Sequence, residues 1–395
     1  MNNLFQIFKN NLTLTRLYWT GCQAFFGLLP VFIIDSSLHY SFYSSTLIIS
    51  YMGMSMLGIN GIANLRWAKS KLNFTRAKPF FYLVVSCGFI TLIAYSFFIK
   101  SDVYTSLLLI TGLLQNIKIL GISYLRNSKN LNVSIFMIQD GFIFLIGSLL
   151  LFFVNSEFDL ILLLTAVFSG GLVFLIPLVT AYLKSQKKSS NKRVIQIMPL
   201  LLREGLFLFF SALFITYIPI LARTAANLSQ SESFFVSFSV ALSIAITIQK
   251  ASLSYFWVLQ KRYWAVRSEG IRKDKSFFKI SILIILTCIL IYLAQIIFDL
   301  INPNIQFSLD VMILTLLITI HRMIVSYFRL HILTVMSVGD VLRNQIVMTL
   351  LIMILFIFLF FVLSLTSLII YFILFIIADI IFIYHLPLSR RTKIM

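Results

Sequence analysis

Charged side chains are scarce in this sequence, and acidic ones are the scarcest. Only 11% of the 395 residues are charged, 60% are hydrophobic, and the mean hydropathy is +0.98. A folded chain of this composition has too little polar surface to face water on all sides. The composition therefore excludes an ordinary soluble domain and predicts a protein whose main solvent is lipid.

Cysteines and recognisable catalytic motifs are equally few. The three cysteines, Cys22, Cys87 and Cys288, fall inside long apolar runs, where a thiol usually serves as a small hydrophobic group. We therefore expect no disulfide and no metal site. The sequence has no phosphate-binding P-loop, no zinc-protease motif and no suitably spaced Ser/His/Asp set, and its polar connections are short. These absences argue against an enzyme and against a bound cofactor.

Long apolar runs are what the sequence has in abundance. A membrane-spanning helix needs about 20 apolar residues, because the hydrocarbon core is about 30 Å thick. Twelve runs qualify, near residues 12–34, 45–64, 79–99, 104–124, 133–154, 160–183, 196–220, 234–258, 276–298, 308–330, 344–363 and 366–385. They lack the alternation of barrel strands. The predicted fold class is an all-α polytopic membrane protein with 12 transmembrane helices.

Positive charge alternates from one connection to the next. Twenty-four of the 32 Lys and Arg residues fall in one alternating set, whereas the opposite set holds only Lys100 and Arg223 against seven acids. By the positive-inside rule the basic set is cytoplasmic, so we expect both termini inside. Orientation and contact with anionic lipids explain the net charge of +19, and no nucleic-acid-binding motif accompanies it. Because Arg16 interrupts the first apolar run, we expect no cleavable signal.

One polar stretch divides the twelve spans into two sets of six. It is the sequence Lys-Ser-Gln-Lys-Lys-Ser-Ser-Asn-Lys-Arg over 184–193. We expect an N-terminal six-helix bundle over 1–183, a cytoplasmic linker over 184–195 and a C-terminal six-helix bundle over 196–395, packed around a central cavity. Parallel repeats of this kind are a common transporter plan.

Six cations lie within the predicted spans or at their margins. A charge at mid-helix costs about 2.5–3.5 kcal/mol to insert, so such residues normally face a bundle interior or water. Polar residues recur at helical spacing beside two of the cations, as Ser239, Ser243, Thr247 and Lys250, and as Thr315, Thr319 and Arg322. We exclude Lys279, which lies at the start of its span, as a snorkelling residue. The candidate substrate-binding residues are Arg16, Lys118, Arg203, Lys250 and Arg322.

These five candidates are not equally strong. Lys250 and Arg322 each lie eight residues, about 12 Å, from the inner end of their spans, and they resist the snorkelling interpretation best. Lys118 is nearer the inner end. Arg16 can equally sit at the interface, and Arg203 can form an ion pair with its neighbour Glu204.

The acids inside the predicted spans are Asp140, Glu204 and Asp379. Two roles stay open for them. Each can neutralise a nearby cation, or it can couple transport to a proton or another ion.

The whole architecture resembles the multidrug/oligosaccharidyl-lipid/polysaccharide exporter superfamily. The features that carry the resemblance are twelve spans split six and six, short loops, cytoplasmic termini and cations in the first and seventh spans. The stretch Gln249-Lys250-Ala251-Ser252-Leu253-Ser254-Tyr255 is similar to a pattern of the Wzx-type flippases, although Phe256 and Trp257 stand where a Pro is common.

The resemblance implies both a substrate and a location. It implies a flippase in the bacterial cytoplasmic membrane that moves undecaprenyl-pyrophosphate-linked O-antigen or related oligosaccharides to the outer leaflet by alternating access. Its intramembrane cations would hold the pyrophosphate, while a polysaccharide polymerase and a chain-length regulator are further candidate partners.

Two other functions stay open. A cation-coupled multidrug exporter would use the three acids for coupling, but the surplus of positive charge disfavours a cationic drug. A membrane glycan polymerase or ligase could also use arginines against lipid pyrophosphate. Such enzymes resemble one another in having a sizeable outer loop, and the connections here are short.

Overall fold

The computed structural model is all-helical over the residues that it describes. These are 12–55, 59, 63, 74–98, 102–127, 132–177, 198–203, 205, 218–263, 275–302, 305–335, 369–370, 372–374 and 376–377. No strand occurs among them. The chain divides into two compact units, Met1–Leu213 and Phe214–Met395.

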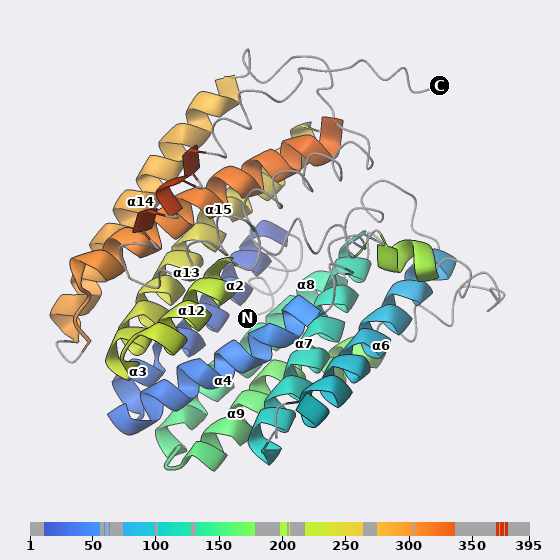
Figure 1. Cartoon of the computed structure of the whole chain (residues 1–395). Coiled ribbons are helices and arrows are strands. Elements are labelled where there is room, and N and C mark those ends of the chain that lie inside the picture. The colour runs from blue at the N-terminus through green and yellow to red at the C-terminus, as the bar shows by residue number, and fades with distance from the viewer. Residues whose placement is uncertain are drawn as a thin grey trace, which may run out of the picture. The chain divides into compact units, whose positions relative to one another are not determined.

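The first unit is a bundle in which α7 and α8 contact most of the other helices. Its elements are α2 (Leu12–Leu28), α3 (Pro30–Ile33), α4 (Ser36–Ser55), α6 (Phe74–Phe98), α7 (Val103–Asn127), α8 (Asn132–Leu150), the 3-10 turn η1 (Leu151–Phe153) and α9 (Glu157–Gly170). Helix α7 packs against α4, α6 and α9, and α2 packs along α8 (Figure 1). Helices distant in the sequence are thereby brought side by side.

Polar side chains cap two of these helices. Ser156 precedes α9, and its hydroxyl accepts a hydrogen bond from the backbone N–H of Asp159 at 3.2 Å. Asp102 precedes α7 and accepts one from the N–H of Thr105 at 2.8 Å. Hydrogen bonds from Thr105 hold the pKa of the exposed Asp102 carboxyl below its usual value. Asp102 and Asp159 therefore lie at helix N-termini, where the helix dipole favours negative charge.

A cluster of phenylalanines forms the core between α2, α4, α8 and α9. Phe26 contacts Phe42, Phe144 and Phe168 with ring centroids 5.7–6.2 Å apart. Phe144 and Phe168 meet edge to face at 5.6 Å. Such tilted geometries add about 0.5–1.5 kcal/mol per pair beyond the burial of area.

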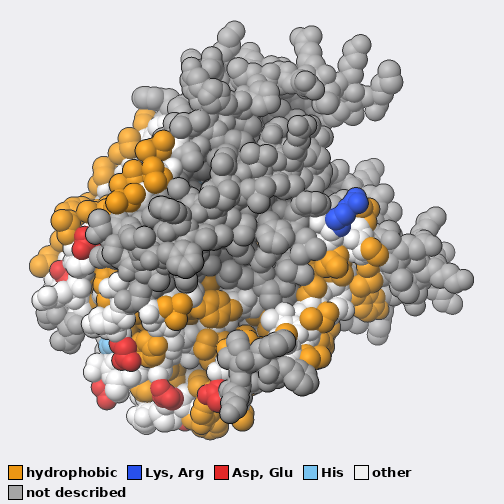
Figure 2. Space-filling view, viewed as in Figure 1, with side chains coloured by type: hydrophobic (Ala, Val, Ile, Leu, Met, Phe, Trp, Pro, Cys, Tyr) orange, Lys and Arg blue, Asp and Glu red, His pale blue; other side chains and the backbone are white. Residues whose placement is uncertain are grey.

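The second unit is built around α13. Its helices are α12 (Ile218–Ser229), α13 (Glu232–Tyr263), α14 (Lys275–Ile301) and α15 (Leu309–Val335), and α13 contacts the other three. In the most apolar stretch of α14 only 17% of residues are buried, against 61% in α13. Figure 2 shows hydrophobic side chains as a band at the upper left, where α14 lies. Helix α14 is therefore peripheral and suited to contact lipid.

Five helices are long and apolar enough to cross a membrane, as expected for a transmembrane protein. They cover Val103–Leu125, Val133–Phe153, Glu157–Pro177, Glu232–Ser252 and Ser281–Ile301. The count of twelve spans stays a prediction, because 344–363 and most of 196–220 and 366–385 lie outside the described residues.

Several elements differ from the predicted spans. The predicted span 12–34 is divided into α2 and α3, and α6 begins at Phe74, five residues before the predicted 79. Helix α4 begins at Ser36, nine residues before the predicted 45, and α12 forms in a stretch mostly taken for a connection. The predicted division into 1–183, 184–195 and 196–395 stays a prediction, since 178–197 lie outside the described residues.

Candidate functional site

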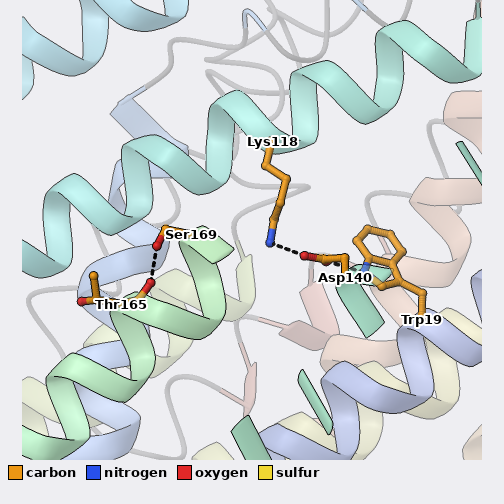
Figure 3. Close-up of polar contacts among 5 residues, drawn as sticks. All are labelled: Trp19, Lys118, Asp140, Thr165 and Ser169. Carbon is orange, nitrogen blue, oxygen red and sulfur yellow. Dashed lines mark hydrogen bonds and ion pairs between the residues drawn. The ribbon is translucent and has the colours of Figure 1, made fainter. Parts of the chain in front are cut away.

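An ion pair buried in the first unit joins α7 to α8. Lys118 Nζ lies 3.0 Å from Asp140 Oδ1, and the two side chains are 2% and 0% exposed. The other carboxylate oxygen, Oδ2, accepts a hydrogen bond from Trp19 Nε1 of α2 at 2.7 Å. Figure 3 shows Lys118 and Trp19 approaching Asp140 from different helices. Both oxygens of the buried carboxylate are therefore satisfied.

The depth of this ion pair follows from the chain itself. Lys118 lies seven residues before Leu125, where its span ends, and Asp140 lies seven residues after Val133, where the next span begins. Each is thus about 10 Å from the same end of the helix pair. Two charges at one depth can neutralise each other inside hydrocarbon, where either alone would be costly.

Close packing encloses the pair. Lys118 Nζ lies 5.5 Å from the centroid of the Phe144 ring. At Gly171 a Cβ atom would stand 2.1 Å from Asp140 Oδ1 and 3.0 Å from Lys118 Cδ, so a larger residue there would force the paired side chains to move. The hydroxyls of α9 near the pair have other partners. Thr165 accepts a hydrogen bond from Thr111 at 3.1 Å, and Ser169 donates one to the Thr165 carbonyl (Figure 3). Of the two roles open for Asp140, neutralisation of a cation is the one that this geometry favours.

Two cations meet in the second unit. Lys250 of α13 and Arg322 of α15 lie close enough for their charges to repel each other. The Lys250 side chain is exposed and that of Arg322 is half-buried. The Arg322 Nη1 atom is itself buried, with no hydrogen-bond partner among the described residues, and no described carboxylate forms an ion pair with Arg322. Among the described residues, Arg322 Nη1 therefore lacks a hydrogen-bond acceptor, which an anionic group would supply.

Further polar residues adjoin the two cations along α13 and α15. Gln249 is 1% exposed, and neither its Oε1 nor its Nε2 has a partner among the described residues. At the same level Thr287 of α14 donates to Ser252 of α13 at 2.9 Å. His321, beside Arg322, is fully buried. The three helices thus share one polar layer, and we call it the cationic layer: Gln249, Lys250, Ser252, Thr287, His321 and Arg322.

The predicted polar stripes differ in how open they are. On α15, Thr315 and Thr319 are buried, and their hydroxyls donate to carbonyls of the same helix. Thr315 also accepts from Gln295 of α14 at 2.8 Å. On α13, Ser243 and Thr247 are only half-buried. The α15 threonines therefore serve packing, whereas the α13 stripe is accessible.

The structure places the remaining predicted site residues as follows. Arg16 is half-buried on α2, and Arg203 is exposed in the helical segment 198–203. Glu204 and Asp379 lie outside the described residues. Cys22, Cys87 and Cys288 are free thiols. The described residues contain no group of three His, Cys, Asp or Glu side chains able to hold a metal ion.

Arg223 was not among the candidate residues, because the apolar pattern places it in a connection. The structure places this residue on α12, where its Nε donates to Ser239 Oγ of α13 at 3.2 Å and its guanidinium lies 5.9 Å from the Phe235 ring centroid. A signal was present, because the run Leu-Ala-Arg-Thr-Ala-Ala-Asn-Leu over 221–228 contains no Gly or Pro and has helix-forming alanines.

Comparison with known proteins identifies no relative. No family model matches the chain, and neither the curated proteins nor the solved structures contain a match.

Proposed function

We propose that this protein is a flippase that moves undecaprenyl-pyrophosphate-linked oligosaccharide repeat units from the inner to the outer leaflet of the bacterial cytoplasmic membrane. The observation that carries the proposal is the cationic layer. Two like charges from α13 and α15 stand close together within the part of the unit that contains a membrane-length span, and Arg322 Nη1 is buried with no partner among the described residues.

An anion bound between the two cations would offset their electrostatic repulsion. Like charges in a medium of low dielectric constant repel strongly, so a conformation that brings them together favours the binding of an anion. A pyrophosphate offers several acceptor oxygens and at least two negative charges, which match an arginine fork beside a lysine. Ser243 and Thr247, half-buried on the same face of α13 as Lys250, supply neutral hydrogen-bonding groups of the kind that sugars use.

The unit-1 ion pair supports this proposal over a cation-coupled drug exporter. That alternative uses Asp140, Glu204 and Asp379 to exchange a proton or an ion, and both oxygens of Asp140 already accept charge-assisted hydrogen bonds from Lys118 and Trp19. In our proposal Asp140 serves the fold. The two compact units provide the bipartite plan that alternating access requires.

The test measures translocation of a fluorescent short-chain polyprenyl-pyrophosphate disaccharide in proteoliposomes. We expect Lys250→Gln and Arg322→Gln each to reduce translocation at least about tenfold, because each removes a charge-assisted contact of about 1.5–3 kcal/mol. Lys250→Arg should retain much of the activity. Lys279→Gln is the matched control, since the sequence places that lysine at the margin of a span.

Two results would reject the proposal. One is wild-type translocation in both glutamine variants. The other is loss of translocation that depends only on Asp140→Asn and is indifferent to the cations, which would favour the cation-coupled exporter. Accumulation of untranslocated lipid-linked repeat units in cells that lack the protein would separate a flippase from a polymerase.

A further inference from the structure

The Arg223 side chain contacts α13 well inside its predicted membrane span. Its partner Ser239 lies seven residues into the span that begins at Glu232, about 10 Å along the helix. The Arg223 side chain is half-buried, and the Phe235 ring lies beside its guanidinium. An ionisable residue at such depth normally lines a path for substrate or ions.

Ser239 begins the accessible polar stripe of α13. Ser239, Ser243, Thr247 and Lys250 follow one another at helical spacing on one face. Beyond the buried Ser239, this face becomes half-buried at Ser243 and Thr247 and exposed at Lys250. By contrast, the apolar side chains of Phe238, Ala241, Leu242 and Ala245, which point elsewhere from α13, are buried. The stripe therefore marks an open face of the helix.

Hydroxyl groups along the stripe are oriented as acceptors. Ser243 donates to the Ser239 carbonyl at 2.7 Å, and Thr247 donates to the Ser243 carbonyl at 2.8 Å. Their protons point into the helix, which leaves oxygen lone pairs toward the open face. From Ser239 to Lys250 the stripe is about 16 Å long, with a cation at each end.

We propose that Arg223 is a second anion-binding residue, which receives the phosphate groups of the substrate after they leave Lys250 and Arg322. This inference rests on the proposed function. The positive-inside rule places Arg223 at the outer end of the stripe and the cationic layer nearer the inner end. A ligand held at one site alone leaves slowly, whereas two weaker sites along one path allow both entry and exit.

The geometry prepares Arg223 for this role. The Ser239 bond at Nε and the Phe235 ring hold the guanidinium at one end of the α13 stripe. The competing interpretation is a tether that only holds α12 against α13. A lysine at this position distinguishes the two roles. It keeps the positive charge that anion binding needs, but it cannot keep the Nε bond to Ser239 that a tether needs.

The experiment compares Arg223→Gln, Arg223→Lys and Ser239→Ala with the wild type. Affinity for a fluorescent polyprenyl pyrophosphate is measured in detergent, its translocation in proteoliposomes, and the unfolding temperature for each variant. We expect Arg223→Gln to slow translocation about tenfold while affinity stays within about twofold, because the inner cations still bind the probe. Arg223→Lys should translocate several times faster than Arg223→Gln.

The outcomes separate three cases. Wild-type translocation by Arg223→Gln, or equal losses of translocation and unfolding temperature in all three variants, would overturn the role of Arg223. If Arg223→Gln does not fold, Arg223→Lys and Ser239→Ala decide: the proposal expects both to retain most translocation, and a severe loss in either refutes it. Failure of the wild type to bind or move the probe would instead refute the proposed function.

Discussion

Lys118 and Lys250 carry the same ammonium group inside predicted membrane spans, yet their surroundings differ. Lys118 is 2% exposed and paired with Asp140 at 3.0 Å. Lys250 is exposed and faces the positive charge of Arg322. The first arrangement pairs opposite charges, whereas the second brings two positive charges together. The same residue type thus serves the fold in one unit and, in our proposal, the substrate in the other.

The first prediction concerns the buried pair. Lys118→Met leaves the Asp140 carboxylate without its counter-ion, which typically costs about 3–5 kcal/mol in a buried pair. Adding Asp140→Asn should recover part of that loss, because the carboxamide oxygen can still accept from Trp19. Thermal unfolding in detergent across the double-mutant cycle should give a coupling energy of about 2 kcal/mol. Strictly additive effects would show that the two side chains do not interact.

Which acid pairs with which cation was beyond the sequence. Asp140 is 22 residues from Lys118 and 121 residues from Trp19. Composition and spacing place all three inside spans, but only the packing of α2 along α8, and of α8 beside α7, brings them together. Pairing was therefore one of two roles left open for Asp140.

Helix boundaries followed the apolar runs wherever those runs are uninterrupted. Helices α7, α8, α13, α14 and α15 begin within two residues of the predicted spans. Helix α4 departs because the polar residues before 45 do not break it: Ser44, for example, donates to the Ser41 carbonyl of the same helix at 3.2 Å. A prediction based on the length of apolar runs therefore misses helical residues whose side-chain hydroxyls bond to carbonyls of their own helix.

The second prediction tests how closely the α9 segment approaches α7 and α8. Gly171→Ala must displace Asp140 Oδ1 or Lys118 Cδ, which would stand 2.1 and 3.0 Å from the new Cβ. We expect a clear fall in unfolding temperature. Gly21→Ala on α2 is the matched control, since nothing lies within 4 Å there and alanine favours a helix by about 0.5–1 kcal/mol. Equal behaviour of the two variants would contradict the close approach.

The third prediction concerns the orientation of the whole chain. Single cysteines are introduced as Asn155→Cys and Ser233→Cys on the acidic side and as Ser128→Cys and Ser189→Cys on the basic side, after Cys22, Cys87 and Cys288 are replaced by alanine. By the positive-inside rule, a membrane-impermeant maleimide should label the first two in intact cells and the second two only after permeabilisation. The opposite pattern would reverse the assignment of cytoplasmic and outer ends.

The sequence by itself determined the membrane-embedded helical class, most described helix positions and the predicted orientation. These properties depend on local composition, because helix formation and insertion are decided segment by segment. The tertiary structure decided which cation is neutralised, why Gly171 must be small and that Arg223 reaches the α13 stripe. Those features depend on contacts between helices, whose side chains meet only after the bundle has packed.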